Sequence, residues 1–148
     1  MTSAATTGAY TFAGVPAGRT YVITPASNVY TFTPASRTLS GLSSSQAGQN
    51  FTASARKTYS ISGRVARAGT TTGIAGVVMT LTNGSTGAVV RTMTTGSNGA
   101  YSLTAIPAGI TYVLRPAKSG VTFSPASRTY ANLSANQPSG ANTGFFGP

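Results

Sequence analysis

The sequence contains no aspartate, glutamate, histidine, cysteine or tryptophan among its 148 residues. General acid–base catalysis, nucleophilic triads and oxygen-ligated metal sites draw on the first four of these residue types. Disulfide bonds and cysteine-ligated zinc sites are excluded for the same reason. Ser–Lys catalysis would need Lys57 or Lys118, and neither lies in a recognisable motif. We therefore predict a protein that is not an enzyme, with no catalytic residues, no cofactor and no bound metal.

The absence of acidic residues leaves ten Lys and Arg residues and a formal net charge of +10. Acidic residues normally make up about half of a charged fraction near 25%. Three explanations are open: the chain binds a polyanion, acidic positions were removed by design, or the written sequence does not record its carboxylates. The basic residues are scattered singly, without a helix, an aromatic–basic pattern or a recognition motif, so we predict no specific nucleic-acid binding.

Long apolar runs are also missing, and Met1 is followed by a polar stretch instead of a signal peptide. A helix that crosses a bilayer needs about 20 apolar residues. We expect no membrane insertion. If the protein is exported, this sequence represents its mature form.

What the sequence does contain is a segment that occurs twice. Residues 8–46 align with residues 99–137 at a displacement of 91 without a gap, and 21 of the 39 aligned positions are identical. Shared Pro and Gly residues suit tight turns, and shared aromatic residues are large enough to fill a core. The candidate core and turn residues are Tyr10, Pro16, Gly18, Tyr21 and Phe32 in the first copy, and Tyr101, Pro107, Gly109, Tyr112 and Phe123 in the second.

Short alternating or apolar runs separated by Gly, Pro and Ser turns predict an all-β fold built of tandem β-sandwich repeats. Strands are expected at residues 59–65, 76–82, 88–95, 100–103, 112–114 and 121–123, with a hairpin turn at Asn83-Gly84. Residues 57–148 then form a complete module of about seven strands. Residues 1–56 form a partial module, because they have no counterpart of residues 59–95.

A sandwich without those strands would expose a sheet edge and one side of its core. Either the chain is a piece of a longer repeat array, or the missing strands come from another chain. The candidate donors are residues 59–95 or the Phe145-Phe146 tail of a neighbouring subunit. The candidate inter-subunit contacts are Tyr59, Ile61, Val65, Phe145 and Phe146.

Five segments of the sequence resemble one family. YSISGRV, GIAGVVMTLT, TTGSNGAYSLTAIPAG, ITYVLRPAKSGVTFSPASRTY and NLSANQ look like the carboxypeptidase regulatory-like, transthyretin-type repeats of bacterial surface proteins. They are also similar to the B-type repeats of collagen adhesins. The resemblance implies an Ig-like or transthyretin-like β-sandwich that serves mainly as a stalk or spacer.

Two family features are changed in this chain. The aspartate that usually precedes the Ser97-Asn98-Gly99 turn is replaced by Gly96, and by Ala5 in the first copy. An internal isopeptide bond, found in related adhesin repeats, would need Lys57 and Asn142, but the carboxylic acid that promotes it is absent. Calcium binding is disfavoured for the same reason.

These observations predict a non-catalytic extracellular structural protein at the cell surface. It would be a repeat subunit of a filament or stalk, assembled head to tail with copies of itself by strand complementation. The alternative is an adhesin binding module for glycans or polyanionic surfaces. Three sequons make Asn50, Asn83 and Asn132 candidate glycosylation sites.

Overall fold

The computed structural model describes residues 7–138 and 144–148. The chain divides into two compact units, which we call unit 1 (Met1–Ala55) and unit 2 (Arg56–Pro148). The described residues form strands, turns and loops, and among them no helix is long and apolar enough to cross a membrane. The all-β prediction is confirmed.

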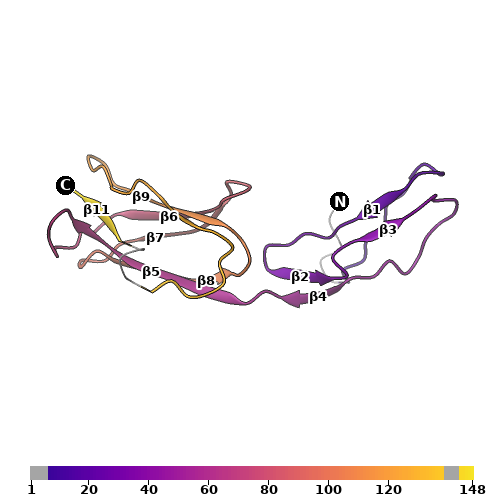
Figure 1. Ribbon diagram of the computed structural model, residues 1–148, viewed down its shortest axis with the longest axis horizontal. Coiled ribbons are helices and arrows are strands. Elements are labelled where there is room, and N and C mark those ends of the chain that lie inside the picture. Colours follow the sequence, from indigo (N-terminus) through magenta and orange to yellow (C-terminus); the bar gives the residue numbers. More distant parts are fainter. Residues whose placement is uncertain (1–6, 139–143) are drawn as a thin grey trace. The chain divides into compact units, whose positions relative to one another are not determined.

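The described residues of unit 2 form seven strands in two sheets, which Figure 1 shows as separate layers. One sheet has the strand order β10-β9-β6-β7, and the other has the order β11-β5-β8. The strands are β5 (Thr58–Arg67), β6 (Val78–Asn83), β7 (Val89–Thr94), β8 (Ala100–Pro107), β9 (Tyr112–Ala117), β10 (Arg128–Tyr130) and β11 (Phe145–Gly147).

The core of unit 2 lies between these two sheets. Successive side chains of a strand point to opposite faces, so alternate residues reach the core. In β5 the inward positions are Ile61, Gly63 and Val65, as the sequence alternation predicts. In β6 they include Met79 and Leu81, which are fully buried. Both sheets contribute to one cluster of buried apolar side chains, so unit 2 is a β-sandwich.

Strand β11 completes the second sheet. It pairs in parallel with β5, with Phe145 opposite Val65, and Phe145 is fully buried. The Phe145-Phe146 tail, expected to be a closing strand or a contact with a neighbour, thus closes the sandwich of its own unit.

The predicted β6–β7 hairpin is confirmed, and residues 84–88 connect its strands directly after Asn83. The Asn83 side chain accepts hydrogen bonds from the amides of Ser85 and Thr86, and Gly87 takes the left-handed conformation (φ 70°). The strand predicted at residues 121–123 is wrong, because isolated bridges alone connect this region to the rest of the unit.

In unit 1 the described part, residues 7–55, forms four short strands in two two-stranded sheets, β1-β3 and β2-β4. These strands are β1 (Tyr21–Ile23), β2 (Tyr30–Thr33), β3 (Arg37–Leu39) and β4 (Thr52–Ala55). None of the described residues 7–55 is buried. Residues 9–12, which correspond to the start of β8, form no strand, because no equivalent of β5 lies among the described residues of unit 1 for them to pair with.

Candidate functional site

The turn after Pro107 is built in the same way as the turn after Pro16. The Tyr112 hydroxyl donates a hydrogen bond to the Pro107 carbonyl at 2.9 Å, and the Tyr21 hydroxyl donates to the Pro16 carbonyl at the same distance. Gly109 and Gly18 both have positive φ, at 74° and 78°. Their amides donate to the carbonyls of Leu133 and Leu42. The candidate turn residues thus make the same contacts 91 residues apart.

An arginine clamp also recurs. In unit 2 the Arg128 Nε donates to the Gly144 carbonyl at 2.9 Å, and the guanidinium lies 5.5 Å from the Phe145 ring centroid. In unit 1 the Arg37 Nε donates to the Asn50 carbonyl at 3.0 Å, with the guanidinium 5.9 Å from the Phe51 ring.

Phe51 is therefore the counterpart of Phe145, and the sequence comparison missed it. The rings of Tyr10 and Phe51 lie 6.4 Å apart, as do those of Tyr101 and Phe145. The offset between the two phenylalanines is 145 − 51 = 94 residues, three more than the repeat displacement. An alignment that allows a three-residue gap after Gln46 would have found the pair.

The core candidates differ between the units. Tyr101 and Tyr112 are 3% and 1% exposed, whereas Tyr10 and Tyr21 are only half-buried. Phe123 and its counterpart Phe32 are both half-buried. A larger set of apolar residues in unit 1 corresponds to buried core residues of unit 2, and we call this set the open face. The open face consists of Tyr10, Phe12, Val15, Tyr21, Ile23, Leu39 and Leu42.

The counterparts of the open face are all buried in unit 2. They are Tyr101, Leu103, Ile106, Tyr112, Leu114, Tyr130 and Leu133. Phe12 shows the largest contrast: it is 51% exposed, while Leu103 is 2% exposed. In unit 2 the inward side chains of β5 and β6, such as Ile61, Val65 and Met79, belong to the same cluster. The described residues 7–55 of unit 1 form no such strands.

The candidate inter-subunit contacts are mostly occupied within unit 2. Ile61, Val65 and Phe145 are fully buried, and Tyr59 packs against the same core. Phe146 is 45% exposed. Among these five candidates, only Phe146 is an exposed apolar side chain without rearrangement of unit 2.

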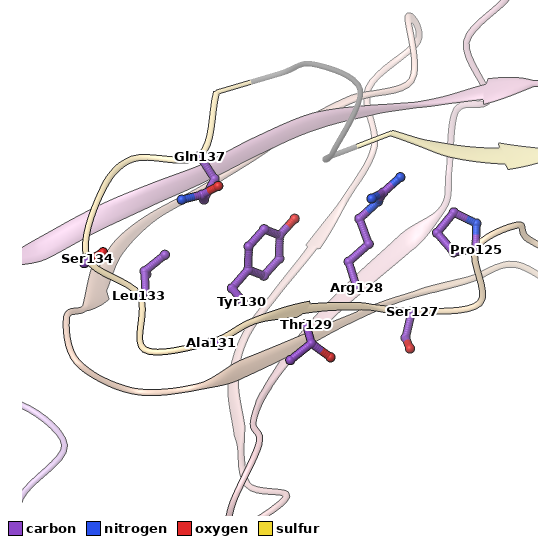
Figure 2. A pocket seen from close by; sticks show the side chains of 9 residues that line it. All are labelled: Pro125, Ser127, Arg128, Thr129, Tyr130, Ala131, Leu133, Ser134 and Gln137. Carbon is purple, nitrogen blue, oxygen red and sulfur yellow. The ribbon is translucent and has the colours of Figure 1, made fainter.

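A pocket of about 520 Å³ lies over β10, and Figure 2 shows its lining. Arg128 and Tyr130 point to one side of the strand, and Ser127 and Thr129 point to the other. Burial raises the pKa of the Tyr130 hydroxyl above its ordinary value. Burial also raises the pKa of Tyr101, and the neighbouring Tyr130 adds to that rise. Both hydroxyls therefore stay protonated at neutral pH.

The residues that line this pocket include no carboxylate, imidazole or thiol side chain. A protonated phenol with a raised pKa is a poor general base at neutral pH. The sequence supplies no carboxylate, imidazole or thiol to activate a serine hydroxyl. The arrangement can therefore donate hydrogen bonds, but it provides no activated nucleophile.

Several basic side chains donate hydrogen bonds to backbone carbonyls. Arg64 Nε donates to the Asn98 carbonyl at 2.7 Å, and Lys118 Nζ donates to the Ala75 carbonyl at 2.6 Å. Arg56 Nη1 donates to the Ala108 carbonyl at 3.3 Å. In each of these contacts a backbone carbonyl oxygen accepts the hydrogen bond that a carboxylate often accepts from such a cation.

The sequon asparagines differ in accessibility. Asn83 is 7% exposed and its side chain caps the β6–β7 loop, so we discard it as a glycosylation site. Asn50 and Asn132 are exposed and stay candidates. Asn132 has φ 45°, and its counterpart Gly41 has φ 57°, which explains why Gly and Asn exchange here. Asn142, the expected isopeptide partner of Lys57, lies outside the described residues.

Residues 57–142, more than half of the chain, match the family described as "BOS complex subunit NOMO1-like, second beta sandwich domain". This supports the Ig-like or transthyretin-like fold expected from the sequence, while the bacterial repeat family stays a prediction. No curated protein matches the chain.

Proposed function

Because the chain belongs to the family of NOMO1-like second β-sandwich domains, we propose that it is a non-catalytic structural module of a multi-subunit assembly. The assembly is an extracellular filament or stalk at the cell surface. Neighbouring subunits join head to tail, and unit 1 receives strands from the next subunit. The finer parts of this proposal, namely the filament, its location and its joint, rest on the arguments that follow.

One observation carries the proposal. Unit 1 repeats the turns, the clamp and the strand register of unit 2, but leaves its core residues uncovered. In unit 1 Tyr21 pairs with Leu39, as Tyr112 pairs with Tyr130 in unit 2. A half-sandwich that keeps this geometry is adapted to receive the strands it lacks, since exposed apolar faces and strand edges otherwise promote aggregation. We infer that the two units are repeats of one module.

The composition supports a structural role. Without His, Cys, Asp or Glu the chain has little means of catalysis. Families of β-sandwich modules often act as spacers whose value lies in their folded shape.

Immunogold electron microscopy tests the location and the assembly. An antibody raised against the chain is applied to the cells that make it. We expect gold along surface filaments or stalks, and none after the antibody is absorbed with the purified chain. Label confined to the cell interior would refute the proposal.

A binding module for polyanionic surfaces or glycans is the second candidate, and the formal charge of +10 favours it. Binding of this kind weakens as salt rises. Salt-sensitive retention of the chain on an anionic polymer, without label on filaments, would favour this candidate over the structural one.

A further inference from the structure

We propose that Met93 is a modification site, at which hydrogen peroxide oxidises the thioether to a sulfoxide and so removes the protection of one edge of strand β8. One contact defines the site: the Ser102 backbone amide donates a hydrogen bond to Met93 Sδ at 3.1 Å. The proposal concerns unit 2 by itself and does not depend on how the chain assembles.

Strand β8 lies at one end of the sheet β11-β5-β8, so its outer edge has no neighbouring strand among the described residues. Unpaired edges can pair with strands of other chains, and folded proteins usually protect them. Here the Gly96 amide donates to the Ala100 carbonyl at 3.1 Å, and Met93 Sδ accepts the Ser102 amide. Farther along, Ala105 has φ 55° where the pairing of β8 with β5 shifts register, and such a bulge bends a strand. The Met93 sulfur therefore takes the place of a backbone acceptor from an adjacent strand.

Met93 differs from Met79 in its access to solvent, although the two lie opposite each other in β7 and β6. Met79 is fully buried, whereas Met93 is half-buried on β7, which lies at one end of its sheet. The chain has no cysteine, so its three methionines carry all of its sulfur, and Met1 lies outside the described residues. Because oxidation of sulfur follows exposure, we expect Met93 to react before Met79.

The oxidant of the reaction is hydrogen peroxide. The Met93 sulfur attacks one peroxide oxygen, an S–O bond forms, and the O–O bond breaks. The proton on the transferred oxygen passes to the departing hydroxide, which leaves as water. The sulfur thereby loses two electrons and the peroxide gains two.

The sulfoxide changes both contacts of the Met93 side chain. As a thioether, the side chain packs against the hydrophobic core and accepts the Ser102 amide. A sulfoxide is polar and carries an additional oxygen, which disrupts apolar packing. Since water solvates this oxygen, we expect the side chain to turn outward and the Ser102 amide to lose its acceptor. The outer edge of β8 then becomes accessible to solvent and to other strands.

Peptide mapping after peroxide treatment tests the site. Trypsin places Met79 and Met93 in separate peptides, residues 68–91 and 92–118. In the folded chain the Met93 peptide should gain one oxygen at least about tenfold faster than the Met79 peptide. In urea the two rates should be similar, because both sulfur atoms are then exposed. Equal rates in the folded chain would overturn the assignment of the site.

Amide hydrogen exchange tests the consequence at the edge of β8. Oxidation should speed exchange of the Ser102 amide by at least about tenfold. The Val65 amide, which donates to the Gly99 carbonyl at 2.8 Å, should keep its protection. Methionine sulfoxide reductase should restore slow exchange at Ser102, because it returns the sulfoxide to the thioether. Selective oxidation of Met93 without faster exchange at Ser102 would overturn the role of the sulfur as a protecting acceptor.

Two leucine variants assign the effect to one sulfur. Met93→Leu keeps an apolar side chain of similar volume but has no sulfur acceptor. Its Ser102 amide should exchange fast before peroxide is added and should not change afterwards. Met79→Leu is the matched control, and it should respond to peroxide as the original chain does. A peroxide response at Ser102 in Met93→Leu would overturn the proposal, and if that variant fails to fold, the original chain before and after oxidation decides the question.

Discussion

Tyr10 and Tyr101 occupy equivalent positions in two units that share the same turns, yet their surroundings differ. Tyr101 is 3% exposed inside a two-sheet core, and Tyr10 is half-buried beside an exposed Phe12. The Tyr21 and Tyr112 hydrogen bonds and the two arginine clamps are the same in both units. Contacts within about 20 residues thus form without a core, whereas burial requires strands from elsewhere in the sequence.

The comparison also indicates where stability resides. Hydrophobic burial is the dominant favourable contribution to folding, and unit 1 has little of it. We therefore expect substitutions at equivalent positions to lower the free energy of unfolding strongly in unit 2 and weakly in unit 1. Three matched pairs of variants test this expectation.

Gly99→Ala should have the largest effect. Gly99 has φ 74°, and a Cβ there would overlap the Val65 carbonyl oxygen and lie 2.8 Å from the Ile74 nitrogen. Left-handed strain and a clash with backbone together should lower the free energy of unfolding by about 3 to 5 kcal/mol. Urea denaturation followed by circular dichroism measures this loss.

Gly8→Ala is the matched variant for Gly99→Ala. Gly8 has φ 68°, but no atom lies within 4 Å of an added Cβ. Only the backbone strain remains, so the expected cost is about 1 kcal/mol. Equal losses in the two variants would mean that the two turns have equally close neighbours, contrary to the comparison.

Leu103→Ala and Phe12→Ala form the second pair. Leu103 is 2% exposed, so its truncation should cost about 2 to 5 kcal/mol. Phe12 is 51% exposed, so its truncation should change the free energy of unfolding by less than about 0.5 kcal/mol. Thermal unfolding of both variants provides the measurement. A large loss for Phe12→Ala in the purified chain would show that the open face is already covered.

The sequence predicted those parts of the fold that depend on local pattern. Alternation in β5 gave its inward residues, and the turns at Gly18 and Gly109 follow from Pro-Ala-Gly. It did not predict that residues 9–12 remain without strand structure, because that depends on a partner strand that unit 1 lacks. It missed Phe51 because the three-residue length difference lies after the aligned copies end.

The site predictions were limited in the same way, because contacts between residues far apart in the sequence leave no local pattern. The sequon at Asn83 looks like those at Asn50 and Asn132, and only the loop geometry reveals that its side chain is buried. The Arg128 clamp depends on a carbonyl 16 residues away, and no motif in the sequence indicates it.

Arg128→Met and Arg37→Met should have intermediate effects. The Arg128 Nε and Nη2 both donate to the Gly144 carbonyl, at 2.9 and 2.7 Å, in a half-buried site. Loss of this charged donor should cost about 2 kcal/mol. The Arg37 bond is more exposed, and its loss should cost about 0.5 kcal/mol. Urea denaturation of both variants measures the two losses in the free energy of unfolding and so checks their ratio. Arg128→Lys is the control that keeps the charge and loses the planar fork, and full stability in Arg128→Met would contradict the role of the clamp.

The smallest expected effect is that of pH on the free energy of unfolding, which changes little near neutral pH and falls only in alkali. Burial raises the pKa values of Tyr101 and Tyr130, so the folded state favours their neutral forms. This contribution is fully present below the unfolded value of about 10, and it is lost as pH rises above that value. The free energy of unfolding should therefore be nearly flat from pH 7 to 9 and fall above pH 10. Leu39 stands in unit 1 where unit 2 has Tyr130, so Tyr130→Leu gives unit 2 the residue of unit 1. That variant and Tyr101→Phe should both show a shallower alkaline loss in urea titrations across this range, and an unchanged slope in both would exclude the buried tyrosine pair as its cause.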